Sequence, residues 1–222
     1  MVRRSKDPLT AASKSILRPA LAPMGFRPYK TRDFICCHGD ILHVVALQLS
    51  AWGSKDFAVN YGAMPLFPAT EYVYLPTGGR LRQGRSPDGW WSALTHEKAD
   101  ASMASVVQAV EDQLPPFFRR TSTYGGLADE LGTIDHPQYT FMKACCEAKI
   151  GHRDARITLE RAISVIKRFL GEHPDTAWVI TRLAEATALA TAIDNGSEQR
   201  LLDEWAQATA TSLKIQRGEP GT

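Results

Sequence analysis

The sequence predicts an α+β fold: an antiparallel hairpin sheet flanked by helices, followed by a helical C-terminal bundle. Residues 34–61 can be aligned as two successive hairpins about short turns, as paired strands require. From residue 138 onward the chain is instead rich in Ala, Leu and charged residues at helical spacing. We therefore expect an α+β domain with the antiparallel sheet at residues 1–120, and a helical C-terminal region at 121–222 packed on it.

The first expected element is a helix that begins at Asp7-Pro8, because an acidic N-cap followed by proline is a common helix start. Pro19 lacks an N–H and crowds the preceding turn, so it should kink or shorten this helix near Leu17. The apolar residues of the segment fall on one helical face: Leu9, Ala12, Ile16, Leu17, Ala20 and Leu21.

The two hairpins follow. Gly39-Asp40 is a Gly-X loop of the type II′ kind, which sets His38 opposite Ile41 and Phe34 opposite Val45. A second loop at 50–56 returns the chain so that Phe57 lies opposite Leu49. Since side chains alternate along a strand, one face should carry Phe34, Cys36, His38, Ile41, His43, Val45, Leu47, Leu49, Phe57, Val59 and Tyr61.

The later elements are predicted from turn and helix signals. We expect a short strand at 72–75, a turn at 77–79 and a further strand at 80–84. Thr95 should cap a helix that Pro115-Pro116 stops. Four more helices are expected at about 138–150, 153–170 and 175–193, and from Ser197 onward.

Composition excludes several classes of protein. The chain has 222 residues, 44% hydrophobic and 23% charged, as in an ordinary globular protein. Its net charge of +2 speaks against a nucleic-acid partner, although residues 1–40 carry eight Lys/Arg against three Asp/Glu. No apolar run is long enough to span a membrane, and the N-terminus lacks a secretory apolar core. The four cysteines form two adjacent pairs rather than a disulfide framework, so we expect a cytoplasmic protein with reduced thiols.

A set of ordered motifs resembles the bacterial domain-of-unknown-function family 4304. The resemblance covers about residues 8–115. It implies the fold and, because the family has no established activity, no function. The matching motifs are Leu17-Arg18-Pro19-Ala20-Leu21, Gly25-Phe26-Arg27, Val45-Ala46-Leu47-Gln48-Leu49-Ser50-Ala51-Trp52 and Phe57-Ala58-Val59-Asn60-Tyr61-Gly62, with Arg82 and Trp90-Trp91 downstream.

One candidate binding site lies on the opposite sheet face. In the predicted register Gln48 lies opposite Ala58 and Ala46 opposite Asn60, so the two amides are diagonal neighbours beside small residues. They could line a shallow groove, or instead satisfy loop backbone groups or cap a packed helix. The candidate ligand-binding residues are Gln48, Ser50, Trp52, Asn60 and Arg82.

Two other groups of residues are weaker candidates for a functional site. Cys36, His38 and His43 share one face and are possible zinc ligands, but no fourth ligand is evident. Arg80, Arg82 and Arg85 next to Trp90-Trp91 could stack on bases or hold an acidic patch, although charge that protects an edge strand is commoner. No catalytic motif, phosphate loop or cofactor signature is recognised.

These observations favour a non-catalytic module that binds another protein through the exposed sheet face or edge. A toxin-neutralising or defence-associated role is one version of this hypothesis. The alternatives are a small-ligand-binding protein or enzyme that uses the Gln48/Asn60 face, and nucleic-acid binding through the basic N-terminal third.

Overall fold

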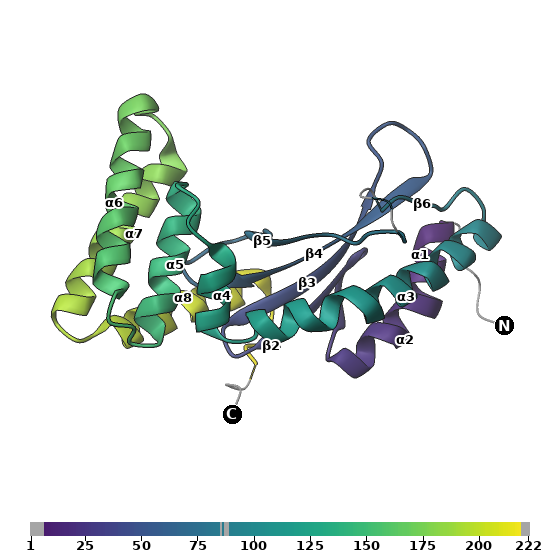
Figure 1. Ribbon diagram of the computed structural model, residues 1–222, viewed down its shortest axis with the longest axis horizontal. Helices are drawn as coiled ribbons and strands as arrows, with labels where there is room; N and C mark the ends of the chain where they lie inside the picture. Colours follow the sequence, from purple (N-terminus) through teal and green to yellow (C-terminus); the bar gives the residue numbers. More distant parts are fainter. Residues whose placement is uncertain (1–6, 85, 87–88, 219–222) are drawn as a thin grey trace. The chain divides into compact units, whose positions relative to one another are not determined.

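The computed structural model describes residues 7–84, 86 and 89–218, which form two compact units (Figure 1). Unit 1 comprises the described parts of 1–36, 43–63 and 78–119. Unit 2 comprises those of 37–42, 64–77 and 120–222. The division cuts through four strands and one helix, so neither unit is continuous in sequence.

The N-terminal segment of unit 1 is helical. Helix α1 (Pro8–Ala12), a π-helical turn (Ser13–Leu17), α2 (Arg18–Leu21) and a 3₁₀ turn (Ala22–Met24) follow one another. The predicted start is confirmed, because the Asp7 carboxylate accepts a hydrogen bond from the Thr10 N–H at 3.2 Å. The helix does not end at Leu17 but continues past Pro19. The π turn that precedes Pro19 is wider than an α turn, which relieves the crowding by the proline ring.

The sheet contains β1 (Arg27–Lys30), β2 (Asp33–His38), β3 (Ile41–Leu49), β4 (Asp56–Pro65) and β5 (Thr77–Arg80) in that order, and β6 (Trp91–Ser92) also pairs with β4. Antiparallel pairing is confirmed. Gly39 has a φ of +54°, as the predicted type II′ loop requires. Two hydrogen bonds match the predicted registers: Leu47 N–H to Arg32 O at 2.9 Å and Ser50 N–H to Asp56 O at 2.8 Å.

Helix α3 (His96–Thr121) covers the aromatic face of the sheet in unit 1 (Figure 1). The Phe118 ring stacks on His43 with centroids 4.6 Å apart, and Phe117 meets Tyr61 edge-on at 5.0 Å. The predicted stop at Pro115-Pro116 is therefore wrong.

The reason lies in where the lost hydrogen bonds fall. The two prolines remove the N–H groups that would bond the carbonyls of Glu111 and Asp112. Both of these residues are exposed, so water can satisfy their carbonyls. Continuing the helix buries Phe117 and Phe118, which favours the longer helix.

The segment between β4 and α3 differs from expectation. Residues 72–75 form no strand, because Tyr74 is held instead by helix contacts within unit 2: its hydroxyl accepts from Gln138 Nε2 at 2.8 Å. The predicted turn at 77–79 is strand β5. Gly78 has a φ of +116°, and a β-carbon there would lie 2.1 Å from the Tyr61 carbonyl oxygen. Position 78 therefore requires glycine because two strands approach each other closely there, and not because the chain turns.

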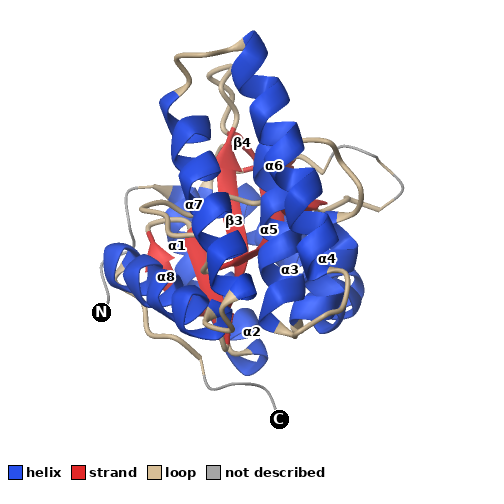
Figure 2. Cartoon of the chain, turned by 90° about the vertical axis from the view of Figure 1, so that its left-hand side faces the viewer, coloured by secondary structure: helices blue, strands red, loops and turns tan. Residues whose placement is uncertain are grey.

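Unit 2 contains α4 (Tyr124–Leu131), α5 (Pro137–Lys149), α6 (Ala155–Glu172), α7 (Ala177–Asp194) and α8 (Glu198–Leu213). The last four confirm the sequence prediction, and α6 and α7 lie side by side (Figure 2). Helix α4 was not predicted, because Gly125 and Gly126 occupy its first turn. The Thr123 side chain caps it, accepting from Gly126 N–H at 3.1 Å. No described helix is long and apolar enough to cross a membrane.

Candidate functional site

A polar cluster in unit 1 joins three neighbouring strands. Asn60 Nδ2 on β4 donates to Gln48 Oε1 on β3 at 2.7 Å. Arg80 on β5 donates from Nε to Asn60 Oδ1 at 3.3 Å and from Nη2 to Gln48 Oε1 at 3.4 Å. The diagonal placement of the two amides is the one that the sequence predicted. The amides hold a guanidinium group, and the sequence did not predict this contact.

Arg80 is also fixed from a second direction. The centre of its guanidinium group lies 4.8 Å from the centroid of the Trp90 ring, a cation–π arrangement. Among the described residues, no carboxylate lies within ion-pair distance of Arg80. Two amide oxygens and one ring therefore orient the group, while its positive charge is left without a described counter-ion.

The outer edge of β5 presents backbone groups to a neighbour. Leu81 N–H donates to Val59 O on β4 at 2.8 Å. Because backbone groups alternate in direction along a strand, those of Gly78, Arg80 and Arg82 point away from β4. At Arg82 both groups are taken by one side chain of α3: the N–H donates to Gln113 Oε1 at 3.0 Å, and Gln113 Nε2 donates to the carbonyl at 2.9 Å. The Gln113 amide thus occupies the place of a neighbouring strand.

A groove of about 890 Å³ runs beside this edge, which we call the β5 groove. Gly79 and Ala109 leave room on its two walls, and a β-carbon on Gly79 would lie 3.5 Å from the Tyr61 hydroxyl oxygen. On the α3 wall, Gln108 Nε2 donates to Asp112 Oδ1 at 3.2 Å. The groove is lined by Tyr61, Gly78, Gly79, Arg80, Arg82, Gln83, Gly84, Ser105, Gln108, Ala109, Asp112 and Gln113.

The comparison with protein families bears on the same part of the chain. Residues 17–120 match the model of a family described as Domain of unknown function (DUF4304). The chain carries a DUF4304 domain. This span includes the Gln48/Asn60/Arg80 cluster and both walls of the β5 groove. No curated protein and no solved structure matches the chain.

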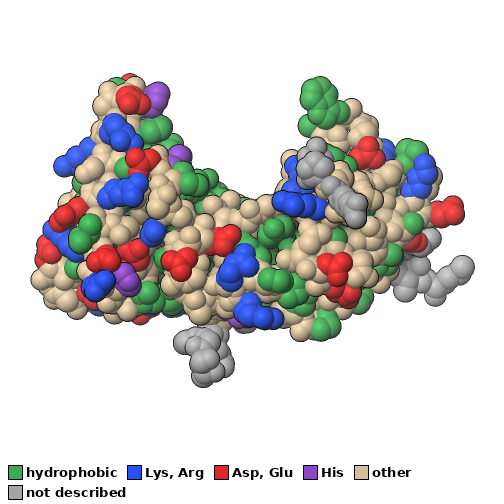
Figure 3. Space-filling model, in the orientation of Figure 1, with side chains coloured by type: hydrophobic (Ala, Val, Ile, Leu, Met, Phe, Trp, Pro, Cys, Tyr) green, Lys and Arg blue, Asp and Glu red, His purple; other side chains and the backbone are tan. Residues whose placement is uncertain are grey.

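The other predicted site residues of the DUF4304 domain lie apart from the cluster. Ser50 Oγ accepts from Trp52 N–H at 3.2 Å in the β3–β4 connection, and the Trp52 side chain is 93% exposed. Figure 3 shows hydrophobic atoms projecting at the end of this connection. Arg82 is exposed and lines the β5 groove. Ala58 is fully buried, so the expected groove beside Gln48 is closed at that position.

Sequence reasoning missed Gln113 and the role of Arg80. Arg80 belongs to the basic cluster noted next to Trp90-Trp91, whose third member, Arg85, lies outside the described residues. The sequence predicted a strand at 80–84 that begins with Arg80, but it gave no register for that strand against the one that carries Asn60, so the contact between them was not predicted. Nothing in the sequence links Gln113 to Arg82, because 31 residues separate them.

The possible zinc ligands of the DUF4304 domain have other surroundings. His43 is buried and stacks on Phe118, and Cys36 is buried with its Sγ close to Gly25. Burial raises the pKa of the Cys36 thiol. His38 is exposed. Among the described residues, no group of three or more His, Cys, Asp or Glu side chains is arranged to hold a metal ion.

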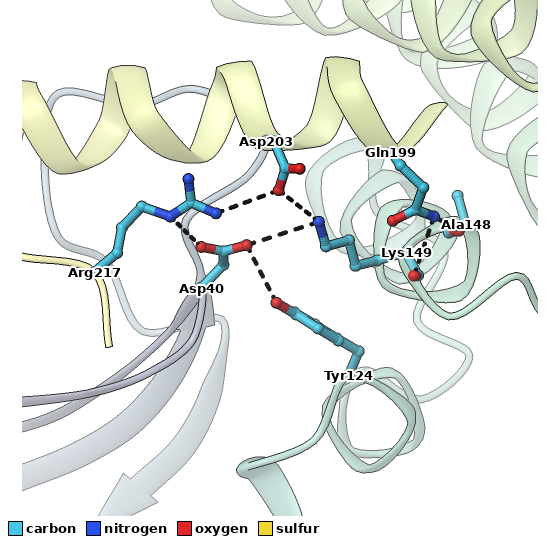
Figure 4. A network of polar contacts seen from close by, with 7 residues as sticks. All are labelled: Asp40, Tyr124, Ala148, Lys149, Gln199, Asp203 and Arg217. Carbon is cyan, nitrogen blue, oxygen red and sulfur yellow. Dashed lines mark hydrogen bonds and ion pairs between the residues drawn. The ribbon is translucent and has the colours of Figure 1, made fainter. Parts of the chain in front are cut away.

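A second polar cluster, in unit 2, surrounds the buried carboxylate of Asp40 at the hairpin loop (Figure 4). Arg217 Nε donates to Asp40 Oδ1 at 2.5 Å. The Asp40 Oδ2 atom accepts from the Tyr124 hydroxyl at 3.2 Å and lies 3.9 Å from Lys149 Nζ. Asp203 Oδ1 completes the ring at 2.6 Å from Lys149 Nζ and 3.3 Å from Arg217 Nη2.

The charges in this ring balance one another. Two carboxylates alternate with two cations, and the hydrogen bond from Lys149 lowers the pKa of Asp203. The hydrogen bond with Asp40 raises the pKa of Arg217, and burial raises that of Tyr124. Gly218 N–H also donates to Gly39 O at 3.1 Å. This cluster therefore fastens the segment after α8 to the hairpin loop, and it leaves no excess charge for a ligand.

Proposed function

We propose that the chain is a non-catalytic protein-binding module that takes up an extended segment of a partner protein as an additional strand on β5. The observation that carries the proposal is the outward-facing backbone of β5 beside the β5 groove. Strand addition requires such an edge, because main-chain hydrogen bonds give the affinity and alternate side-chain positions give the specificity.

The Gln113 contact supports this reading of the edge. An amide group already pairs with the outward N–H and C=O of Arg82, in the way that a peptide group of an added strand would. Gly78 and Arg80 offer the same two groups, and no hydrogen bond to the outward side of either is found among the described residues. The groove places an open volume next to them, with α3 as its far wall.

Trp52 gives the partner a second possible contact. A tryptophan side chain that is 93% exposed is unusual on a protein surface, and tryptophan is enriched at energetically dominant interface positions. We place the module in the cytoplasm, where cysteines are kept reduced, in keeping with four cysteines that form no disulfide.

A small-ligand-binding protein remains the second candidate function, and one observation favours it. The guanidinium of Arg80 is oriented by Gln48, Asn60 and Trp90 and has no counter-ion among the described residues, so a small carboxylate or phosphate compound could bind there. Such a ligand would contact the side chain of Arg80 and leave the β5 edge open.

The test is selection of linear peptides from a random display library on the immobilised full-length chain. Enriched peptides should bind the wild type and the Glu111→Trp variant but not the Asp112→Trp variant. Both residues are exposed acids on α3, but only Asp112 lines the β5 groove, so the pair matches in charge and substitution. Circular dichroism should show that both variants fold.

Hydrogen exchange distinguishes strand addition from other modes of binding. A bound strand should slow exchange of the Gly78 and Arg80 amides and leave that of Leu81, which already bonds to β4, unchanged. The proposal fails if no peptide is enriched, or if the enriched peptides bind the Asp112→Trp variant as tightly as the wild type. Protection confined to residues outside β5 would refute strand addition on this edge.

A further inference from the structure

We propose that the segment taken up by β5 is short and acidic, with a bulky residue opposite Gly79, Asp or Glu opposite Arg80, and a second Asp or Glu two positions further along, toward Arg82. This inference rests on the proposed function and names the chemistry of its partner. It follows from the charge, the side-chain alternation and the closed end of the β5 edge.

The charge of the β5 edge is positive on one face. Arg80 and Arg82 are two residues apart, so their side chains share the face that carries Asn60. In an added strand, the residue opposite Arg80 lies on that same face at the distance of a cross-strand pair, where opposite charges are favourable. The residue two positions along reaches Arg82 in the same way. Acids at these two alternate positions therefore complement the edge.

The residue opposite Gly79, which is the neighbour of the acid opposite Arg80, points to the other face, into the β5 groove. There Gly79, which has no side chain, and the small Ala109 leave space beside the Tyr61 ring. A bulky side chain fills that space and packs on the ring. Asp112, the acid on the α3 wall, lines this groove and accepts a hydrogen bond from Gln108. The acids of the partner therefore lie on the face away from Asp112.

The length of the paired segment is limited by Gln113. Because its amide occupies both outward groups of Arg82, an added strand can pair with Gly78 and Arg80 only. The strand must leave the edge at Arg82, where the guanidinium of that residue is exposed to meet its second acid. We infer that Gln113 determines where the partner strand ends.

The peptide selection described above tests the chemistry of the partner separately from the mode of binding. Enrichment of peptides with a bulky residue, an acid, any residue and a second acid, in that order or its reverse, supports the inference. Enrichment of groove-dependent peptides without acids overturns it while the proposed function stands. If no peptide is enriched, the proposed function itself fails.

Charge reversal gives a second test with a matched control. For an enriched peptide, Arg82→Glu should weaken binding about tenfold in fluorescence anisotropy, because an attractive cross-strand pair becomes a repulsive one. Repeating the selection on that variant should replace one acid by Lys or Arg. Arg27→Glu, an exposed arginine on the opposite edge strand β1, should change neither result. Equal weakening by both variants would mean that only net charge matters and would overturn the inference.

The Gln113→Ala variant tests the end of the paired segment. In the free variant the Arg82 amide should exchange faster than in the wild type, because its hydrogen-bond acceptor is gone. Addition of an enriched peptide lengthened by two residues should restore protection at Arg82 in the variant. If the longer peptide leaves the Arg82 amide unprotected in the variant, Gln113 does not set the length of the strand.

Discussion

Replacing Asp40 by asparagine should destabilise unit 2 by removing the central charge of its buried ring. Asp40 is 4% exposed in its side chain, Lys149 13% and Arg217 31%. Asparagine keeps the size of the side chain and an oxygen that can accept from Tyr124. The change therefore isolates the loss of negative charge beside two cations.

The expected loss of stability depends on the negative charge that remains beside each cation after the substitution. Breaking a buried ion pair by removing one partner costs about 3–5 kcal/mol when the remaining charge is fully buried. Here both cations retain Asp203, at 2.6 Å from Lys149 and 3.3 Å from Arg217, and Arg217 is partly solvated. We therefore expect the free energy of unfolding to fall by about 2–3 kcal/mol, at or below the lower end of that range.

Urea denaturation followed by far-UV circular dichroism measures this loss. The midpoint should fall with an unchanged slope. Asp135→Asn is the control, because that carboxylate also contacts two arginines but lies at the surface, and its removal should change the midpoint little. In a double-mutant cycle, Asp40→Asn and Arg217→Met should cost less together than the sum of the single changes. Wild-type stability of Asp40→Asn, or strict additivity, would refute the reasoning.

Three further predictions concern stability and reactivity. Burial lowers the pKa of His136, whose Nδ1 caps α5. Stability should therefore fall as the pH drops from about 6.5 toward that lowered pKa, because the unfolded chain takes up the proton more readily. His136→Asn keeps a cap but cannot titrate, so its urea midpoint should stay constant over this range. Gly78→Ala should cost more stability than Gly53→Ala in urea, because both have positive φ but only the first β-carbon would collide with β4; equal losses would contradict the close-approach argument. Burial raises the pKa of the Cys145 thiol, so iodoacetamide should label the half-buried Cys37 before Cys145. Mass spectrometry of the native protein would show this order, and labelling of both cysteines at the same rate would contradict the prediction.

The features that the sequence predicted are local ones. The hairpin registers follow from a Gly-X turn and from side-chain alternation, both of which act within about ten residues. The four C-terminal helices of the prediction likewise follow from helical spacing, which is a local pattern. The full length of helix α3 was not predicted, because packing of Phe117 and Phe118 on the sheet outweighs the local effect of two prolines.

The candidate site was predicted in part for the same reason. Gln48 and Asn60 lie on strands joined by a short turn, so their proximity could be inferred. Arg80 comes from a strand whose glycines indicate a turn when only neighbouring residues are considered. Its place on the sheet depends on a close backbone approach to β4, which no local pattern encodes.

The ion pair between Asp40 and Arg217 has a consequence for biosynthesis, because its two members are 177 positions apart. During translation the β2–β3 loop leaves the ribosome long before either the arginine or Lys149 has been made. Until then the aspartate has neither cation to pair with, so its carboxylate stays hydrated while the strands of the hairpin can already pair. Burial of this carboxylate therefore waits until translation has passed α8.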